Sequence, residues 1–186
     1  MKPADVVEFW FSERAKAKWF VKEDAFDDEI RTKFGAEIDR AAGGTYDAWL
    51  ADPLGALAVV VLCDQFPRNI YRNSPRAFAQ DAKAREVARI AIDRGHDRAV
   101  GTDQRMFFYL PFEHSELLVD QDRSVQLFTA WAAAQPAGSA DDEMKYVHRH
   151  REIVARFGRF PHRNAALGRD STADELAFLS EKNSSF

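Results

Sequence analysis

Apolar residues recur at helical spacing along most of the chain. Phe26, Ile30, Phe34 and Ile38 follow one another every four residues, and Gly43-Gly44 comes after them as a helix stop. This spacing places one apolar stripe along the side of a helix that faces a core. No alternating apolar and polar run of any length occurs, so the pattern predicts an all-α fold.

One segment is apolar on every side. It runs from Leu54 to Phe66 and follows Asp52-Pro53, a capping residue with proline at the first helical position. A helix that is apolar all round is buried all round, so we expect this segment to be the central helix of the fold. Because Pro67 disfavours helical geometry at the residue before it, the helix is predicted to end at Phe66.

Start and stop signals mark further helices. A long helix is predicted after Ser74-Pro75, with Gly95 as its stop, and a last one after a capping box of Thr172 and Glu175. Other predicted helices cover residues 103–110, 114–134 and 142–157. The one break in composition, residues 135–140, is short enough to be a loop. We therefore expect a single domain, residues 1–186, of about eight or nine helices arranged as antiparallel hairpins.

Composition and charge narrow the class of protein. The 186 residues are 46% apolar, enough for one core, and the net charge is −4. This small charge, with arginines mixed among carboxylates, argues against a nucleic-acid partner. The longest apolar run, Leu54 to Cys63, is far shorter than the roughly 20 residues of a membrane helix, and no cleavable signal is visible. We expect a cytoplasmic protein without a membrane partner, in which Cys63 is a buried, unreactive thiol.

Two short runs nearly repeat each other. Asp64–Asn69 reads DQFPRN, and Arg159–Asn164 reads RFPHRN. We call them the first and the second FP motif. Each places an aromatic residue, a proline, an arginine and an asparagine after an apolar helical stretch. We expect the two motifs to face each other and to supply two arginines and two asparagines to one polar centre.

Several polar residues interrupt apolar helix faces. His114 and Gln121 occupy the apolar stripe of the helix predicted at 114–134, and His150 lies on the inward face of the next helix. A buried polar group without a partner costs roughly 1–3 kcal/mol, so each of these side chains requires a partner or a ligand. Two glutamates flank His114 closely enough to raise its pKa, which would suit a general acid or base.

Carboxylates also stand where their charge is unfavourable. Asp64 is predicted in the last turn of the central helix, where the helix dipole disfavours it, and Arg68 and Arg72 are near in sequence to offset it. A second acidic set lies on one side of the helix predicted at 114–134, where like charges repel. This set comprises Glu113, Glu116 and Asp120. We expect an arginine from an FP motif, or Arg123 in the same helix, to relieve the repulsion between them.

Signatures of known chemistry are weak. His148 and His150 are alternate residues of a predicted helix and point about 200° apart, so they cannot bind one metal ion together. No glycine-rich phosphate loop or nucleophile elbow occurs. The sequence predicts neither a metal site nor a cofactor.

The two FP motifs and three further runs resemble a known bacterial family. The chain is similar over essentially its whole length to the domain-of-unknown-function 924 family. The resemblance implies an all-helical, tetratricopeptide-like fold, and it implies no mechanism because the family has no established activity. Cys63 stands where this family more often has an aliphatic residue. The further matching runs are Phe9-Trp10-Phe11, His114-Ser115-Glu116 and Leu167-Gly168-Arg169.

Three functions remain open. The first is a binding module with a polar cleft for an anionic small molecule or peptide, because the arginine fork pairs bidentately with carboxylate or phosphate. The second is a hydrolase-like enzyme in which His114 or His150 is the general base, oriented by Glu116 or Asp64. The third is a structural or interaction scaffold in which both motifs are helix corners. The candidate binding residues are Asp64, Arg68, Asn69, Arg72, His114, Glu116, Gln121, His150, Arg163 and Asn164.

Overall fold

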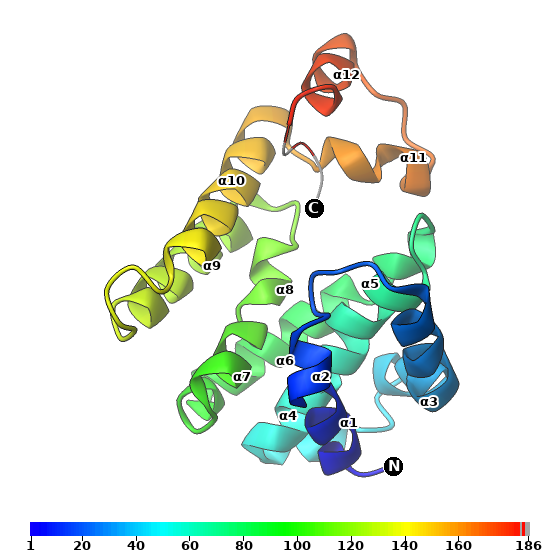
Figure 1. Cartoon of the computed structure of the whole chain (residues 1–186), viewed down its shortest axis with the longest axis vertical. Helices are drawn as coiled ribbons and strands as arrows, with labels where there is room; N and C mark the ends of the chain where they lie inside the picture. The colour runs from blue at the N-terminus through cyan, green and yellow to red at the C-terminus, as the bar shows by residue number, and fades with distance from the viewer. Residues whose placement is uncertain (183, 185–186) are drawn as a thin grey trace. The chain divides into compact units, whose positions relative to one another are not determined.

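The computed structural model describes residues 1–182 and 184, and all its regular elements are helices (Figure 1). The all-α fold predicted from the apolar spacing is therefore confirmed. The packing of the chain divides it into two compact units: residues 1–72 with 76–111, and residues 73–75 with 112–186. The single domain stays a prediction. In the part of the chain that is described, no helix combines the length and apolar character needed to cross a membrane.

The first unit is built from helices on both sides of the central apolar segment. Short 3-10 turns connect several of them, at Asp47–Ala51, Pro75–Ala77 and His96–Arg98. The α-helices are α1 (Pro3–Trp10), α2 (Glu13–Lys16), α3 (Asp24–Ala42), α4 (Pro53–Val60), α5 (Phe66–Ile70), α6 (Asp81–Asp93) and α7 (Thr102–Phe107), and α8 (Leu110–Glu113) spans the boundary with the second unit.

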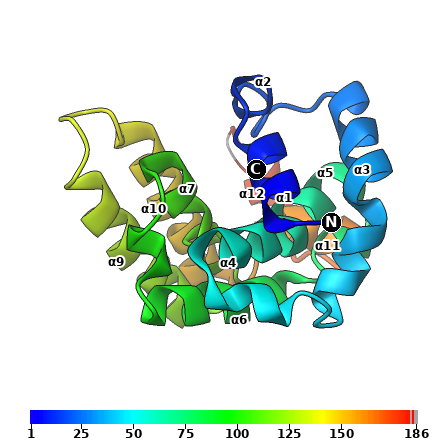
Figure 2. The same ribbon diagram turned by 90° about the horizontal axis from the view of Figure 1, so that it is seen from below.

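Helix α4 lies at the centre of the first unit. It packs against α1 on one side and α6 on another, which Figure 2 shows. Leu54, where the predicted segment begins, is exposed, but all residues from Gly55 to Val60 are buried, so the prediction of a central, buried helix is confirmed from Gly55 onward. Beside it, rings from separate helices pack together, with the Trp10 and Phe66 centroids 5.4 Å apart and those of Phe34 and Phe66 4.9 Å apart. Such aromatic contacts add to the free energy gained by burial.

The predicted end of the central helix at Phe66 is wrong. After α4 the chain continues as a π-helical turn, Val61–Gln65, and then directly as α5. The Phe66 N–H donates to the Val61 carbonyl, five residues back. Pro67 then lies in the first turn of α5, where proline's missing N–H costs nothing, so the chain passes through it without stopping.

Cys63 lies inside this π-helical turn. Its side chain is completely buried. Burial raises the pKa of the Cys63 thiol to about 12. The thiol is therefore protonated at neutral pH and unreactive, as its place in the apolar run predicted.

Two other helices begin later in the sequence than predicted. The helix predicted after Ser74-Pro75 begins at Asp81, because a separate 3-10 turn comes first. The helix predicted at 114–134 begins at Leu118, so His114 lies in the turn before it rather than on its apolar stripe. The reason is local: the Ser115 hydroxyl accepts the Leu117 N–H at 3.2 Å, a side-chain to backbone bond that competes with helix formation.

The second unit contains a helical hairpin and a C-terminal cap. Helices α9 (Leu118–Ala132) and α10 (Asp141–Phe157) lie side by side (Figure 1). Gly158, with a φ of 69° that favours glycine, ends α10. A 3-10 turn (Pro161–Arg163), α11 (Asn164–Leu167) and α12 (Ala173–Leu179) follow. The apolar core beneath them comprises Ile153, Val154, Phe160 and Phe178.

The predicted capping box of the last helix is confirmed. The Thr172 hydroxyl accepts the Glu175 N–H at 3.2 Å, and the Glu175 carboxylate accepts the Thr172 N–H at 2.8 Å. Two backbone donors at the start of α12 are thus satisfied by side chains that are close in sequence.

Candidate functional site

Arg68 of the first FP motif forms ion pairs with the carboxylates of Asp64 and Asp81. Its Nη1 and Nη2 donate to the two oxygens of Asp81 at 2.8 and 3.0 Å, and Nη1 also donates to the Asp64 carbonyl at 2.9 Å. Asp64 is completely buried, and its carboxylate accepts from the Gln65 side chain at 2.6 Å. Burial opposes the charged guanidinium, but Asp81 and Asp64 outweigh it and raise the pKa of Arg68. The cluster fastens α5 to the start of α6.

A second carboxylate anchors the rest of this motif. Asp27 of α3 is buried and accepts from Asn69 Nδ2 at 2.8 Å and from Arg72 Nε at 2.8 Å. A further bond joins Arg72 Nη2 to the same carboxylate at 3.2 Å. The four candidate residues of the first unit therefore belong to two ion-paired clusters that tie α5 to α3 and α6.

The second FP motif meets the segment between α8 and α9. Glu116, in that segment, accepts both Nη atoms of Arg169 at 2.7 and 2.9 Å and the Phe160 N–H at 2.8 Å. Burial raises the pKa of Glu116, but the Arg169 guanidinium and the Phe160 N–H prevail and hold it below its ordinary value. Glu116 is thus an ionised anchor for the second motif.

Two more candidates hold the same turn through its carbonyls. Arg163 Nη1 donates to the His114 carbonyl at 3.0 Å, and its guanidinium lies 4.4 Å from the centroid of the Phe160 ring. Gln121 Nε2 donates to the carbonyls of Glu113 at 2.6 Å and Ser115 at 2.7 Å. Since both side chains are buried, the turn is fixed from two sides.

His150 lies beside a carboxylate that the sequence did not assign to it. Its Nδ1 is 3.0 Å from Glu113 Oε1 and 2.8 Å from the Tyr146 carbonyl oxygen. A carbonyl oxygen only accepts hydrogen bonds, so Nδ1 carries a proton and donates to the Tyr146 carbonyl. The centroid of the His150 ring lies 6.5 Å from that of His114.

The acidic set predicted to repel has separate partners. Its members do not share one helix, since α8 ends at Glu113 and α9 begins at Leu118. Asp120 accepts from the Ser115 hydroxyl at 2.6 Å. Arg163 of the second motif adds only a weaker attraction to Glu116. Glu113 contacts His150, Glu116 pairs with Arg169, and Asp120 accepts from Ser115.

Some buried polar atoms around the second motif lack a hydrogen-bond partner among the described residues. They include Gln121 Oε1, Asn164 Oδ1 and Arg169 Nε. Asn164 uses its other amide atom to donate to Ser171 Oγ at 3.0 Å and to Glu175 at 3.4 Å. Because most buried polar atoms in folded proteins are paired, this concentration distinguishes the second motif from its surroundings.

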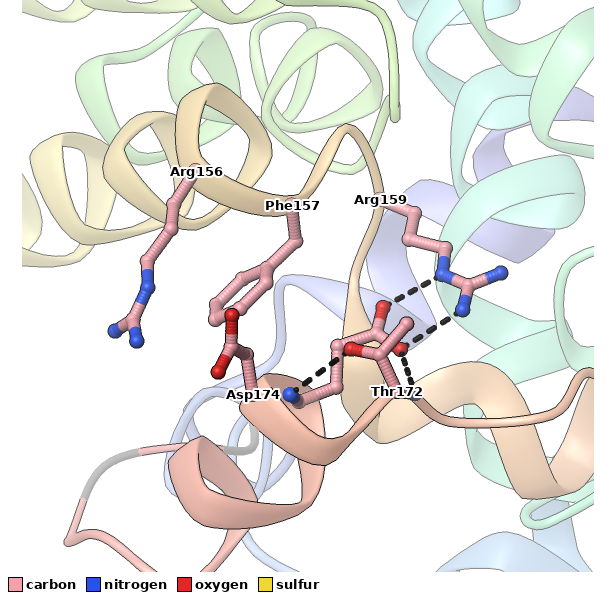
Figure 3. Close-up of a pocket in the computed structure, with 6 residues that line it drawn as sticks. Arg156, Phe157, Arg159, Thr172 and Asp174 are labelled. Atoms are coloured by element: carbon pink, nitrogen blue, oxygen red, sulfur yellow. Dashed lines mark hydrogen bonds and ion pairs between the residues drawn. The ribbon is translucent and has the colours of Figure 1, made fainter.

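The second unit also has a pocket that the sequence did not predict. Its volume is about 440 Å³, and Figure 3 shows it between the end of α10 and the start of α12. In the sequence, only the capping box of Thr172 and Glu175 pointed to this region, and it predicted a helix start rather than a pocket. Within residues 1–182 and 184, no three His, Cys, Asp or Glu side chains form a group that could hold a metal ion. The pocket is lined by Arg156, Phe157, Arg159, Thr172, Asp174 and Glu175.

This helical fold and motif arrangement belong to a bacterial family. A family model described as "Bacterial protein of unknown function (DUF924)" matches residues 6–183, so the chain belongs to the DUF924 family. A solved structure of a protein of unknown function from Agrobacterium tumefaciens is also similar. It shares 40% sequence identity, the match covers 96% of each chain, and the TM-score is 0.87. The comparison with curated proteins found no match.

Proposed function

We propose that the protein is a binding module whose second FP motif takes up an anionic small molecule or a peptide carboxylate. The observation that carries this proposal is the group of buried, unpartnered polar atoms on Gln121, Asn164 and Arg169. A buried polar atom without a partner costs roughly 1–3 kcal/mol, and a ligand that supplies the missing bonds recovers that free energy.

The charges of the cluster suit a carboxylate ligand with hydrogen-bond donors. Arg163 and Arg169 supply guanidinium groups, which recognise carboxylates in a planar, bidentate way. The unpartnered oxygens of Gln121 and Asn164 are acceptors, so the ligand would offer N–H or O–H groups to them. An acylated amino acid or a short peptide meets both requirements. The proposed centre comprises His114, Glu116, Gln121, His150, Arg163 and Asn164, with Arg169 added.

The candidates of the first unit have a different proposed role. Arg68 and Arg72 already donate to Asp81 and Asp27, so their guanidinium forks are occupied by protein carboxylates. We assign Asp64, Arg68, Asn69 and Arg72 to holding α5 in place. We therefore propose a structural role for the first FP motif and a binding role for the second.

Replacing Arg163 by lysine is expected to weaken binding of N-acetylglycine, used as the probe, by about tenfold or more. Lysine keeps the charge but loses the fork that contacts carboxylate and the His114 carbonyl together. Isothermal titration of wild type and variant with N-acetylglycine, and with inorganic phosphate for comparison, measures the change.

Arg151→Lys is the matched control. Arg151 lies on α10 of the same unit and pairs with Asp122 at 2.6 Å, with both side chains substantially exposed. This variant is expected to bind the probe like the wild type. If a folded Arg163→Lys protein binds N-acetylglycine unchanged, or if no probe in the series binds the wild type, the second motif is not an anion site.

A second candidate function, proton-transfer catalysis such as hydrolysis, is favoured by one observation. The 3.0 Å contact between His150 Nδ1 and Glu113 orients the ring, as a carboxylate does for a histidine that acts as a general base. If a panel of ester, amide and phosphate substrates reveals turnover, His150→Gln is expected to reduce kcat/KM by about 100-fold or more. Turnover that is equal in wild type and His150→Gln would eliminate His150 as the base.

The proposal extends to location and architecture. The mixed charge and the short apolar runs support a cytoplasmic location. The α9–α10 hairpin supports a tetratricopeptide-like arrangement, in which successive hairpins stack to form a binding surface.

A further inference from the structure

The pocket between α10 and α12 adjoins the second FP motif, because Arg159 of that motif lines it, but it shares no residue with the proposed binding centre. None of its lining residues is among the candidate binding residues, and the whole pocket lies within the second unit. Its volume of about 440 Å³ falls within the roughly 300–1,000 Å³ of small-molecule sites. The question is which ligand its side chains would recognise.

Arg156 presents a guanidinium that makes no ion pair with any of the described carboxylates. Its guanidinium carbon lies 4.5 Å from the centroid of the Phe157 ring and 5.9 Å from that of Phe178, and ring contacts are all that it makes among the described residues. Ring contacts use the face of the guanidinium, while its N–H groups point outward from the edge. The rings therefore position Arg156 and leave its donors available to a carboxylate.

Asp174 supplies the opposite charge to the same pocket. It lies in the first turn of α12 and makes no ion pair among residues 1–182 and 184. In Figure 3 the charged ends of Arg156 and Asp174 extend to the same side of the pocket, next to the Phe157 ring. The pocket thus offers a cation and an anion, neither of which has an ion-pair partner within residues 1–182 and 184, beside the apolar ring of Phe157.

The opposite wall of the pocket is rigid. Arg159 Nε and Nη2 donate to the two oxygens of Glu175 at 2.6 and 2.8 Å, and Nη2 also donates to the Asp170 carbonyl at 2.8 Å. The capping box joins Glu175 to Thr172. Because this wall is held by bidentate and capping bonds, a ligand would not have to order it on binding, which favours affinity.

We propose that this pocket binds a free α-amino acid with an aromatic or large aliphatic side chain. Arg156 pairs with its carboxylate, Asp174 pairs with its ammonium group, and Phe157 packs against its side chain. A ligand with only one of the two charges leaves one pocket charge without a partner. This inference goes beyond the proposed function, since both the ligand class and the residues differ.

Titrations followed by ¹H–¹⁵N NMR spectra test the inference with three probes of similar size: L-phenylalanine, 3-phenylpropionate and phenethylamine. L-Phenylalanine is expected to shift the amide signals of residues 156–159 and 172–175 in a saturable way. Its affinity is expected to exceed that of each single-charge analogue by about tenfold, because each analogue lacks one charge-assisted contact. Arg156→Gln and Asp174→Asn are each expected to weaken L-phenylalanine binding about tenfold for the same reason.

Arg123→Gln is the matched control, since Arg123 is an exposed arginine of α9 that does not line the pocket. Its affinity for L-phenylalanine is expected to equal that of the wild type, and thermal unfolding verifies that all three variants are folded. Three results would overturn the inference: no saturable shifts at these amides, equal binding of 3-phenylpropionate and L-phenylalanine, or unchanged affinity in both pocket variants. Arg163→Lys leaves Arg156 and Asp174 unchanged, so the test of the proposed function and the test of this pocket can fail independently of each other.

Discussion

Arg68→Met is expected to lower the free energy of unfolding by about 3–5 kcal/mol, the usual cost of removing one partner of a buried ion pair. Methionine fills much of the same volume, so the loss comes chiefly from charge. Asp64 is completely buried and Asp81 is largely so, and both would lose the guanidinium that is paired with them. Urea unfolding at neutral pH, followed by circular dichroism, measures the change as a lower midpoint with an unchanged slope.

Arg89→Met is the control for this variant. Arg89 pairs with Asp93 one helical turn away at 3.4 Å, and its side chain is 63% exposed. Exposed pairs of this kind contribute about 0–1 kcal/mol. If Arg68→Met is as mild as Arg89→Met, the first motif does not hold α5 through charge. Adding Asp64→Asn to Arg68→Met is expected to restore part of the stability, because it removes one of the stranded charges.

The parts of the fold that the sequence predicted correctly are those fixed by near neighbours. The four-residue spacing from Phe26 to Ile38 corresponds to α3, and the capping box of Thr172 and Glu175 begins α12. In both cases the interacting groups are three or four residues apart, so their geometry follows from the helix itself. The all-α class needed nothing more than such local patterns.

The errors occur where distant packing overrides a local preference. At Pro67 the local rule predicts a helix end, but a π-helical turn lets the chain continue and keeps the buried Asp64 next to Arg68. At His114 the helix is replaced by a turn that Gln121 and Arg163 hold through its carbonyls. The residues next to Pro67 do not reveal the first deviation, whereas at His114 the local bond between Ser115 and Leu117 acts together with these contacts.

The residues of the candidate site were selected by type, and their partners were not predicted. Arginines and acids were singled out correctly as groups that need partners, yet the partners are far away in sequence. Asn69 bonds to Asp27 over 42 residues, and Glu116 bonds to Arg169 over 53 residues. Spacing along one helix carries no information on such pairs. The pocket beside α12 was missed for the same reason, because its walls come from two helices.

Glu175→Gln is expected to lower the free energy of unfolding at pH 7 by about 2–3 kcal/mol, as for the loss of charge-assisted hydrogen bonds. The carboxylate accepts two bonds from Arg159, one from the Thr172 N–H and one from Asn164. Chiefly through the Arg159 bonds, and despite burial, the pKa of Glu175 falls to about 2. Glutamine has the same shape but no charge, so it tests the charge rather than the packing.

The pH dependence of this loss identifies its cause. In the unfolded chain Glu175 titrates near its ordinary pKa of 4.5, and in the folded protein near 2. Its contribution is therefore complete above about pH 5 and disappears as the pH falls from there to about 2, where the carboxylate is protonated in both states. The stability difference between wild type and Glu175→Gln is expected to shrink over this range in urea unfolding at a series of pH values.

Glu143→Gln separates this effect from general acid denaturation. Glu143 lies in the first turn of α10 and has no ion pair among the described residues. Its stability difference from the wild type is expected to be small and nearly constant with pH. A constant difference for Glu175→Gln as well would mean that Arg159 does not depress the pKa of Glu175. The Arg159–Glu175 pair would then lose its role as the rigid wall of the pocket, and with it the physical reason for a preorganised amino-acid site.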